Sequence, residues 1–403
     1  MVCSSVKNLN VQNYAQPNHE VSTHMVEDEL IIFDNRSKQL ARMNESATRI
    51  WKLHQKNTTV DEITQHFSDV YGMEKEKIFP DVVKALDEWQ TMGLLGNDFI
   101  PLANEAEDVL GYMEEISLFS KYKKKLQKVK SYALLDSEFN IFVSNSEIKN
   151  ILLPVIAHFP IGDSNLSHTI RIIEEKNSYV ILDENKLVGR CNAIDEIVPI
   201  VNGHILVTSF LEVDCLSVFH AGVIYNNNDG VVLFSAGSGS GKSTLTAALM
   251  CTGKQIFSDE VAILTHDKKI RPSPSCIGLK KGSWDIIKQY YPSIFELATH
   301  HRQDDKVVKY LPPSSLPTTS QLKKGESVKA VIFPNYSPGH ETALIPISAA
   351  DALVKLTDAG YHTNQFLDHN AVTNLIGWIK EIPAYELSIN DLREAVDLVE
   401  TLL

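Results

Sequence analysis

Cysteine is scarce in this sequence, and the cysteines that are present form no recognisable pattern. A disulfide framework or a structural zinc site needs cysteines in pairs or at short, regular spacings. No Cys-x-x-Cys pair occurs, so we expect reduced thiols and neither kind of site. The five cysteines among the 403 residues are Cys3, Cys191, Cys215, Cys251 and Cys276.

Long apolar runs are also missing. A membrane-spanning helix needs about 20 mostly apolar residues in succession, and we find no run that approaches this length. The first residues, up to Asn18, are polar and rich in Asn and Gln, without the basic region and apolar core of a secretion signal. We therefore expect a cytoplasmic protein that contacts no membrane.

Positive charge is in deficit. Lysine and arginine number 38 against 51 aspartates and glutamates, which gives a formal net charge of -13. Nucleic-acid binding depends on basic side chains that neutralise phosphates, so we expect no nucleic acid as partner. The hydrophobic content of 43% is that of an ordinary globular protein, and the length is enough for two or three domains.

The segment that indicates a function most directly is the glycine-rich stretch Ala236–Thr244, AGSGSGKST. It follows the apolar run Val231–Phe234, typical of a buried strand, and precedes a helix predicted from Leu245 to Cys251. Strand, glycine-rich turn and helix form the context of a phosphate-binding loop, in which backbone N–H groups and the helix N-terminus bind phosphate oxygens. The motif usually begins with glycine, and here begins with another small residue, Ala236.

This loop predicts which residues bind a nucleotide, and we expect ATP and Mg²⁺ as cofactors. Lys242 is expected to reach the terminal phosphates, and the Ser243 hydroxyl to hold the metal. The predicted nucleotide-binding residues are Gly237, Ser238, Gly239, Ser240, Gly241, Lys242, Ser243 and Thr244.

Two adjacent acids, Asp259 and Glu260, interrupt an apolar segment, residues 255–264, that is typical of a strand or a strand pair. If they face opposite ways on one strand, one can contact Mg²⁺ while the other approaches an acceptor hydroxyl. Phosphoryl transfer needs such a carboxylate because the attacking hydroxyl loses its proton. The alternative is an edge strand with two solvent-facing acids.

The order of these motifs resembles HPr kinase/phosphorylase and its relatives over residues 130–403. The resemblance implies the fold shared by HPr kinase and phosphoenolpyruvate carboxykinase, and a serine kinase activity. It further implies that Asp259 is the general base with help from His220, that Lys242 holds the phosphates, and that Ser243 and Glu260 bind Mg²⁺. The matching residues are His220, Gly222, Gly239, Gly241, Lys242, Ser243, Asp259 and Glu260.

Two further segments of this region each have two interpretations. Lys280 and Lys281 either reach the phosphates or form a surface pair. Residues 302–317, which include Arg302, form either a mobile substrate loop or a connector. We identify no segment that matches the dephosphorylating part of the bifunctional enzymes.

Residues 20–97 predict a small separate domain of three short strands followed by three helices, which is a winged-helix-like arrangement. The helices are expected to begin after Asn44, after the Thr59 capping box and near Pro80, and Gly93 is expected to end the third. Together the signals predict an α+β unit.

The motifs of this domain resemble the PqqD-like family of peptide chaperones. The resemblance implies that residues 20–97 bind the leader of a ribosomally made precursor peptide as an added strand on an exposed sheet edge. A structural role, or assembly of a homo-oligomer, is the alternative. The residues that carry the resemblance are Met43, Asn44, Ile50, Trp51, Asp61, Glu62, Ile63, Asp81, Val82, Ala85, Leu86, Gly93, Leu94 and Leu95.

These expectations combine into one α/β chain in which a helical linker, residues 98–130, joins the PqqD-like domain to a catalytic domain, residues 131–403. The expected function is an ATP-dependent serine kinase whose N-terminal domain raises the effective concentration of the peptide. A small-molecule kinase and a nucleotide-switched binding module remain as alternatives. The module is disfavoured because the chain has neither the Asn-Lys-x-Asp of guanine-binding proteins nor the Leu-Ser-Gly-Gly-Gln of transporter ATPases.

Overall fold

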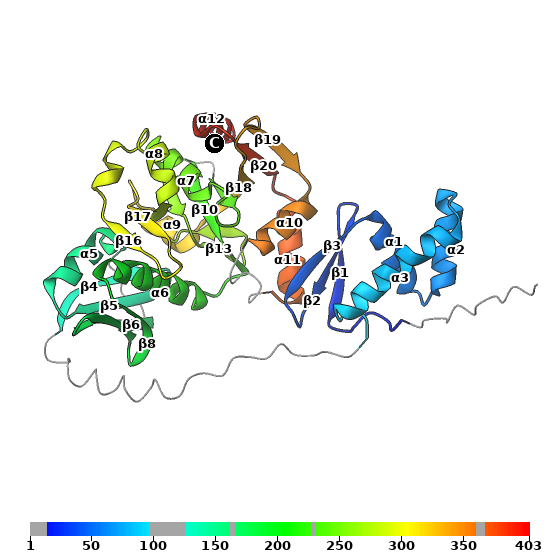
Figure 1. The fold of residues 1–403 in the computed structure, drawn as a ribbon, viewed down its shortest axis with the longest axis horizontal. Helices are drawn as coiled ribbons and strands as arrows, with labels where there is room; N and C mark the ends of the chain where they lie inside the picture. The colour runs from blue at the N-terminus through cyan, green and yellow to red at the C-terminus, as the bar shows by residue number, and fades with distance from the viewer. Residues whose placement is uncertain (1–13, 97–125, 161–165, 227–229, 360–366) are drawn as a thin grey trace, which may run out of the picture. The chain divides into compact units, whose positions relative to one another are not determined.

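The computed structural model describes residues 14–96, 126–160, 166–226, 230–359 and 367–403. The chain divides into two compact units, which we describe separately (Figure 1). Unit 1 is Met1–Glu105 with Asp368–Thr373, and unit 2 is Ala106–Leu367 with Asn374–Leu403.

The predicted helical linker, residues 98–130, lies mostly outside the described residues. Its last residues are described, and there the helical prediction is wrong, because the strand β4 (Gln127–Leu134) begins at Gln127. Antiparallel pairing with the next strand, Ser137–Val143, and burial of Tyr132 and Leu134 hold these residues extended.

Unit 1 contains the predicted three strands in an antiparallel sheet of order β1-β2-β3. The central strand carries four consecutive buried apolar residues, Leu30–Phe33, which form part of the domain core. The strands are β1 (Val21–Val26), β2 (Glu29–Asp34) and β3 (Gln39–Met43).

Three helices follow the sheet, as predicted. They are α1 (Glu45–His54), α2 (Val60–Tyr71) and α3 (Lys75–Thr91). Asn44 caps α1, and the Thr59 capping box opens α2. The predicted start of α3 near Pro80 is wrong, because α3 begins five residues earlier at Lys75 without a side-chain cap that sequence could reveal. Gly93 follows the end of α3 with a left-handed φ of 73°, as a helix-ending glycine does.

The first part of unit 2 is a five-stranded sheet of order β4-β5-β6-β7-β8, in which only β5 and β6 are parallel. Two helices that the sequence analysis did not predict pack on it and close a core with residues such as Leu152 and Val201. The elements after β4 are β5 (Ser137–Val143), α5 (Ser146–Ile156), β6 (Leu166–Glu175), β7 (Ser178–Asp183), β8 (Lys186–Cys191) and α6 (Ile197–Leu211).

One helical segment of the described chain, Ile194–Leu211, is long and apolar enough to cross a membrane by length and composition, with a mean hydropathy of 1.3. The expectation that no such run exists is therefore wrong for this segment. The run is easily overlooked in the sequence, because the polar residues Asn202 and His204 interrupt it. In the structure Ile197 and Ile205 are fully buried in the core. Core helices that are apolar on most sides have the same composition.

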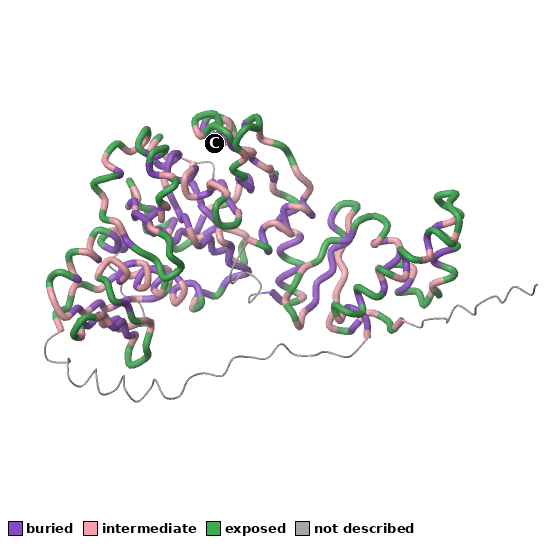
Figure 2. Tube along the Cα trace, in the orientation of Figure 1, coloured by how far each residue is buried: buried purple, intermediate pink, exposed green. Residues whose placement is uncertain are grey.

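The second part of unit 2 is a nine-stranded mixed sheet whose centre is buried (Figure 2). The order β12-β10-β11-β18-β14-β13-β9 is extended by β20, which pairs with β18 and β19. All six residues of β11 are buried, as the apolar run before the glycine-rich loop predicts. The strands are β9 (Ser217–Phe219), β10 (Ala221–Asn226), β11 (Gly230–Ser235), β12 (Gln255–Ser258), β13 (Ala262–Leu264), β14 (Lys269–Arg271), β18 (Glu326–Tyr336), β19 (Ala343–Ile347) and β20 (Ala384–Ile389).

Helix α7 (Lys242–Cys251) follows β11 and shares one hydrophobic core with α12 (Leu392–Glu400). A small sheet of order β15-β17-β16 adjoins this core. The other elements are β15 (Ile277–Lys280), α8 (Trp284–Ile287), β16 (Thr299–His301), β17 (Val307–Leu311), α9 (Thr319–Lys324), α10 (Ala349–Asp358) and α11 (His369–Ile379), of which the residues up to Thr373 are assigned to unit 1.

Candidate functional site

The glycine-rich loop connects β11 to α7 and lines a cavity of about 930 Å³ in unit 2. Gly239 and Gly241 both have a φ of 94°, a left-handed conformation that residues with a side chain rarely adopt. α7 begins directly after Gly241, so its first backbone N–H groups and its positive dipole end lie at the loop. All eight predicted nucleotide-binding residues, Gly237–Thr244, line the cavity.

Gly222 fixes how closely α7 approaches the sheet. A Cβ atom on this glycine would lie 2.4 Å from Thr246 Oγ1, closer than real atoms come. The Thr246 hydroxyl donates to the Lys242 carbonyl one turn earlier, so it occupies a defined place at the start of α7. Gly222 therefore belongs to the packing that positions the loop.

His220 and the two acids lie at two breaks between consecutive strands of the large sheet. His220 separates β9 from β10, and residues 259–261 separate β12 from β13. β10 pairs with β12 and β9 pairs with β13, so the two breaks face each other. Residues 255–264 form a strand pair, one of the two predicted arrangements, and the acids lie in the break between the strands instead of facing opposite ways on one strand. Ser258 Oγ accepts from the N–H groups of Glu260 and Val261 and turns the chain there.

Asp259 and Lys242 form a buried pair. The side chains are 2% and 6% exposed, Lys242 Nζ lies 3.8 Å from Asp259 Oδ1, and it donates a hydrogen bond to the Asp259 carbonyl. Burial raises the pKa of Asp259 to about 6, against the opposing charge of Lys242 and with the help of Glu260. Asp259 is thus a carboxyl group that exchanges its proton close to neutral pH.

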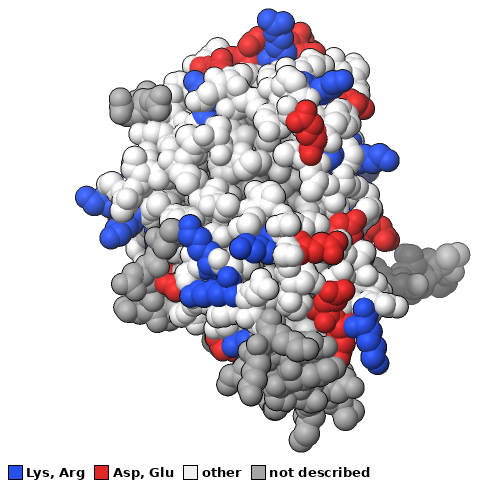
Figure 3. Space-filling model, turned by 90° about the vertical axis from the view of Figure 1, so that its left-hand side faces the viewer, with Lys and Arg blue, Asp and Glu red and all other residues white. Residues whose placement is uncertain are grey.

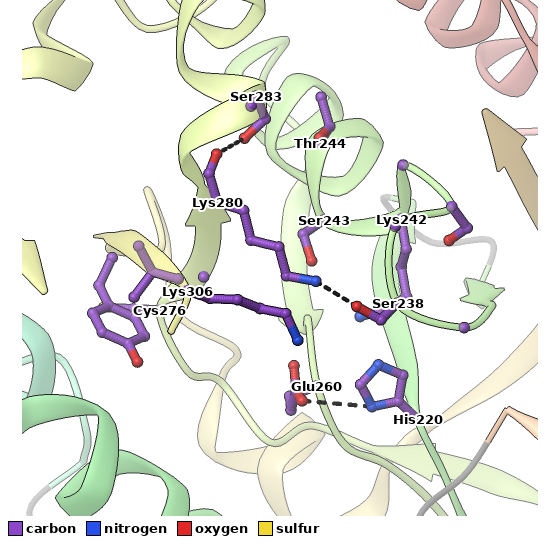
Figure 4. A pocket seen from close by; sticks show the side chains of 18 of the residues that line it. His220, Ser238, Lys242, Ser243, Thr244, Glu260, Cys276, Lys280, Ser283 and Lys306 are labelled. Carbon is purple, nitrogen blue, oxygen red and sulfur yellow. Dashed lines mark hydrogen bonds and ion pairs between the residues drawn. The ribbon is translucent and has the colours of Figure 1, made fainter. Parts of the chain in front are cut away.

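Glu260 and His220 face the cavity, and Asp259 is not among the described residues that line it. His220 Nδ1 lies 3.5 Å from Glu260 Oε1, and Glu260 is 43% exposed (Figure 4). Burial and the nearby Lys242 lower the pKa of His220 to about 4, so its imidazole is neutral at pH 7. The structure therefore brings together all the predicted catalytic residues but places Glu260, not Asp259, on the cavity wall.

Two lysine side chains, Lys280 and Lys306, extend toward the glycine-rich loop from another part of the cavity wall. Lys280 Nζ donates to Ser238 Oγ at 2.7 Å, and Lys306 extends into the same space (Figure 4). Burial, with the charges of Lys306 and Arg302, lowers the pKa of Lys280. Lys281 is exposed and does not line the cavity. The lysine pair thus divides into one cavity residue and one surface residue.

Residues 302–317 were expected to form a mobile substrate loop or a connector, but they include the strand β17. Arg302 and Lys306 lie in the turn between β16 and β17, where both form ion pairs with Asp304. All three line the cavity, and the following strand β17 adds Tyr310. In Figure 3 several basic side chains lie close together near the middle of this face, and others are scattered toward its edges among acidic ones.

The residues suit a magnesium ion that is shared with phosphate groups. No group of three or more His, Cys, Asp or Glu side chains in the described parts of the chain could hold a metal ion alone. Ser243 and Glu260 nevertheless both line the cavity, and Asp259 Oδ1 beside them has no hydrogen-bond partner within the described residues. Mg²⁺ takes few protein ligands and completes its shell with phosphate oxygens and water, so this oxygen donor set fits it.

Unit 1 offers a separate candidate surface. Among the described strands, β1 and β3 each pair with β2 alone, which leaves an edge at either side of the sheet. A second cavity of about 540 Å³ runs along α3 and is lined by Pro80, Val83, Lys84, Asp87, Glu88, Thr91 and Met92. A sheet edge and a helix groove are the features that accept an extended peptide.

Residues 29–95 match the family described as Coenzyme PQQ synthesis protein D (PqqD). These residues form a PqqD-like domain. A solved structure titled "TbiB1 in Complex with the TbiA(beta) Leader Peptide" is 16% identical, with a TM-score of 0.20, and the match covers 21% of this chain and 99% of that one. None of the curated proteins matches this chain.

The sequence analysis missed several cavity residues. Asn202 of α6, Ser275 before β15 and Tyr336 at the end of β18 all line the cavity. No motif marks them, because their contribution depends on where distant elements pack. Tyr336 could have been suspected only from its position after the apolar strand that neighbours β11.

Proposed function

We propose that this chain is an ATP-dependent kinase that phosphorylates a serine hydroxyl on a ribosomally made precursor peptide. The observation that carries the proposal is that the glycine-rich loop, Lys242, His220 and Glu260 line one cavity, with Asp259 buried directly behind Lys242. A binding module that only senses nucleotide has no need of a buried carboxyl group with a pKa of about 6 next to the loop lysine.

In this proposal Asp259 accepts the proton of the serine hydroxyl. The serine oxygen forms a bond to the γ-phosphorus of ATP while the bond to the bridging oxygen breaks, and the electron pair leaves with ADP. Lys242 and the N-terminus of α7 stabilise the phosphate charge. Lys242 must turn from Asp259 toward the phosphates, which also frees the carboxylate for its proton.

Neutral His220 orients Glu260 through their 3.5 Å contact. Glu260 and Ser243 would hold Mg²⁺, which supplies positive charge to the phosphate oxygens when it is bound. Asp259 and Glu260 can exchange roles in a second version of the same mechanism, since Glu260 faces the cavity.

The PqqD-like domain would bind the leader segment of the precursor. Strand addition to a sheet edge takes affinity from main-chain hydrogen bonds and selectivity from side-chain pockets. Its connection to unit 2 would hold the acceptor serine near the cavity at a high effective concentration.

The proposal is tested with γ-labelled ATP, Mg²⁺ and a mixture of serine-containing peptides. The wild-type chain should bind Mg-ATP by calorimetry and label the peptides on serine. Lys242→Ala should reduce labelling by a factor of about 10² or more, because a group that stabilises the transferring phosphoryl is lost. Binding of Mg-ATP without any labelled peptide would exclude the peptide kinase and leave the small-molecule kinase and the nucleotide-binding module.

A further inference from the structure

The cavity continues beyond the phosphate loop into an apolar lobe formed by α6 and β9. Seven residues of α6 between Pro199 and Phe210 line the cavity, which places them along one side of the helix, and none of them is charged. Lys280, Arg302 and Lys306 line the same cavity from β15 and from the turn after β16. The lobe residues are Pro199, Gly203, Leu206, Val207, Phe210, Val218 and Phe219.

This lobe adjoins the catalytic acids and lies apart from the other end of the loop. Val218 and Phe219 precede His220 directly, and Val261 follows Glu260. The other end of the loop contacts different elements. There Tyr336 donates its backbone N–H to the Ser240 carbonyl, and Ile389 lies near Gly241. We place the nucleotide base on this second side, where Tyr290 and Asn390 also line the cavity, and the acceptor in the α6 lobe.

Among the described residues that line the cavity, three have a buried side-chain oxygen without a hydrogen-bond partner: Asn202, Ser240 of the phosphate loop, and Ser275. Asn202 is 7% exposed and Ser275 is 1% exposed, and neither Asn202 Oδ1 nor Ser275 Oγ has a partner. Asn202 lies on α6 and Ser275 lies in the segment that leads into β15, and both line the cavity. Buried polar groups in folded proteins are nearly always paired, so these two atoms indicate a ligand with polar groups of its own.

We infer that the lobe binds the apolar residue next to the acceptor serine of an extended peptide segment, with Asn202 accepting a hydrogen bond from that peptide's backbone. The inference rests on the proposed function, whose acceptor it specifies. An extended segment offers both an apolar side chain and a backbone N–H within one residue, which matches the pairing of an apolar lobe with a buried amide oxygen. A compact, highly charged acceptor matches neither.

Gly203 allows the lobe to be filled without disturbing the fold. A Cβ atom on Gly203 meets nothing within 4 Å, and its φ is not in the left-handed region. Gly203→Phe should therefore occupy the lobe. Gly377→Phe is the matched control, because Gly377 is also a helical glycine with open space and does not line the cavity.

The experiment uses the full chain, Mg-ATP and a serine peptide library in which each neighbouring position is fixed in turn. Wild type should label peptides with Leu, Val or Phe beside the serine about tenfold or more better than those with Lys or Glu. Gly203→Phe should lower kcat/KM for the apolar peptides by a similar factor with the Kd of Mg-ATP unchanged, and Gly377→Phe should behave as wild type. Asn202→Leu should raise KM for peptide without lowering Tm, because it removes an unpaired atom.

The outcomes separate this inference from the proposed function. Labelling that ignores the neighbouring residue, or that Gly203→Phe leaves unchanged, overturns the inference and leaves the kinase. Weaker Mg-ATP binding in Gly203→Phe makes the lobe the base pocket and also overturns it. A wild-type chain that binds Mg-ATP and labels no peptide overturns both. If Gly203→Phe does not fold, Gly203→Leu takes its place in the same comparison.

Discussion

At the scale of single residues, Asp259 and Glu260 are adjacent in sequence but differ in environment. Asp259 is almost fully buried against Lys242, while Glu260 faces the cavity and contacts His220. Two adjacent carboxyl groups in such different surroundings are suited to different roles.

Substitution of each acid separates the roles. Asp259→Asn keeps the shape and removes the proton acceptor, so Mg-ATP binding should persist while transfer falls by about 10² or more. Glu260→Gln should instead raise the Mg²⁺ concentration needed for half-maximal rate. Calorimetry and rate measurements on both variants check this. Loss of nucleotide binding in Asp259→Asn with normal binding in Glu260→Gln would mean that the roles are exchanged.

The pH dependence of the rate reports on the same pair. Burial raises the pKa of Asp259 to about 6, so the base is protonated below this pH and kcat/KM should fall roughly tenfold per pH unit there. The charge of Glu260 contributes to the raised pKa of Asp259, so Glu260→Gln should move the decline to lower pH. A profile that is flat between pH 4 and 8, or the same in both proteins, would contradict the assignment.

At the scale of elements, Arg36 links the sheet of unit 1 to the end of α3. Arg36 Nε lies 2.9 Å from Asp34 Oδ1, and Arg36 Nη2 donates to the Gly93 carbonyl at 2.6 Å. Burial opposes ionisation of Asp34, but hydrogen bonds from Arg36 and Ser37 hold its pKa below the usual value. The ionised pair thus fixes α3 against the sheet.

Arg36→Met should destabilise unit 1 by about 3–5 kcal/mol, because it leaves the buried Asp34 charge unpaired. Denaturant unfolding followed by Trp51 and Trp89 fluorescence measures this. Lys77→Met is the control, since its exposed pair with Glu74 should contribute less than about 0.5 kcal/mol. Equal effects of the two substitutions would refute the role given to Arg36.

The contact between β10 and α7 gives a second prediction for elements. Gly222→Ala should displace the start of α7 and weaken Mg-ATP binding, because the new Cβ would lie 2.4 Å from Thr246 Oγ1. Adding Thr246→Ala removes that oxygen and should restore most of the affinity. Calorimetry on the single and double variants measures the rescue, and a double variant as weak as Gly222→Ala would argue against a steric cause.

At the scale of the whole molecule, the proposal requires that the two units act on one peptide. The full chain should phosphorylate a precursor with its leader better than the same peptide without it, chiefly through a lower KM. The leader contributes binding energy that is equal in the ground and transition states. A leader added as a separate peptide at micromolar concentration should restore little, because a short linker provides about millimolar effective concentration. Equal kcat/KM with and without the leader would leave the PqqD-like domain an assembly role.

The sequence alone determined the elements whose signals lie within a few residues. Gly239 and Gly241 identify the phosphate-binding loop without any knowledge of the surrounding fold. The caps at Asn44 and Thr59 predict α1 and α2 because each capping hydrogen bond spans only three residues. The loop residues and the two adjacent acids could therefore be identified as candidate site residues from the sequence.

Only the tertiary structure decided how these parts meet. Asp259 and Glu260 lie in different environments because the chain turns between β12 and β13, opposite the break between β9 and β10 with which these strands pair. Lys280 and Ser238 are 42 residues apart in the sequence and form a hydrogen bond in the cavity wall. Helix α6 was missed because its apolar residues serve a core on one side and a cavity on the other, which leaves no clear periodic pattern. Such placements result from packing between distant segments, and a single sequence carries no local signal for them.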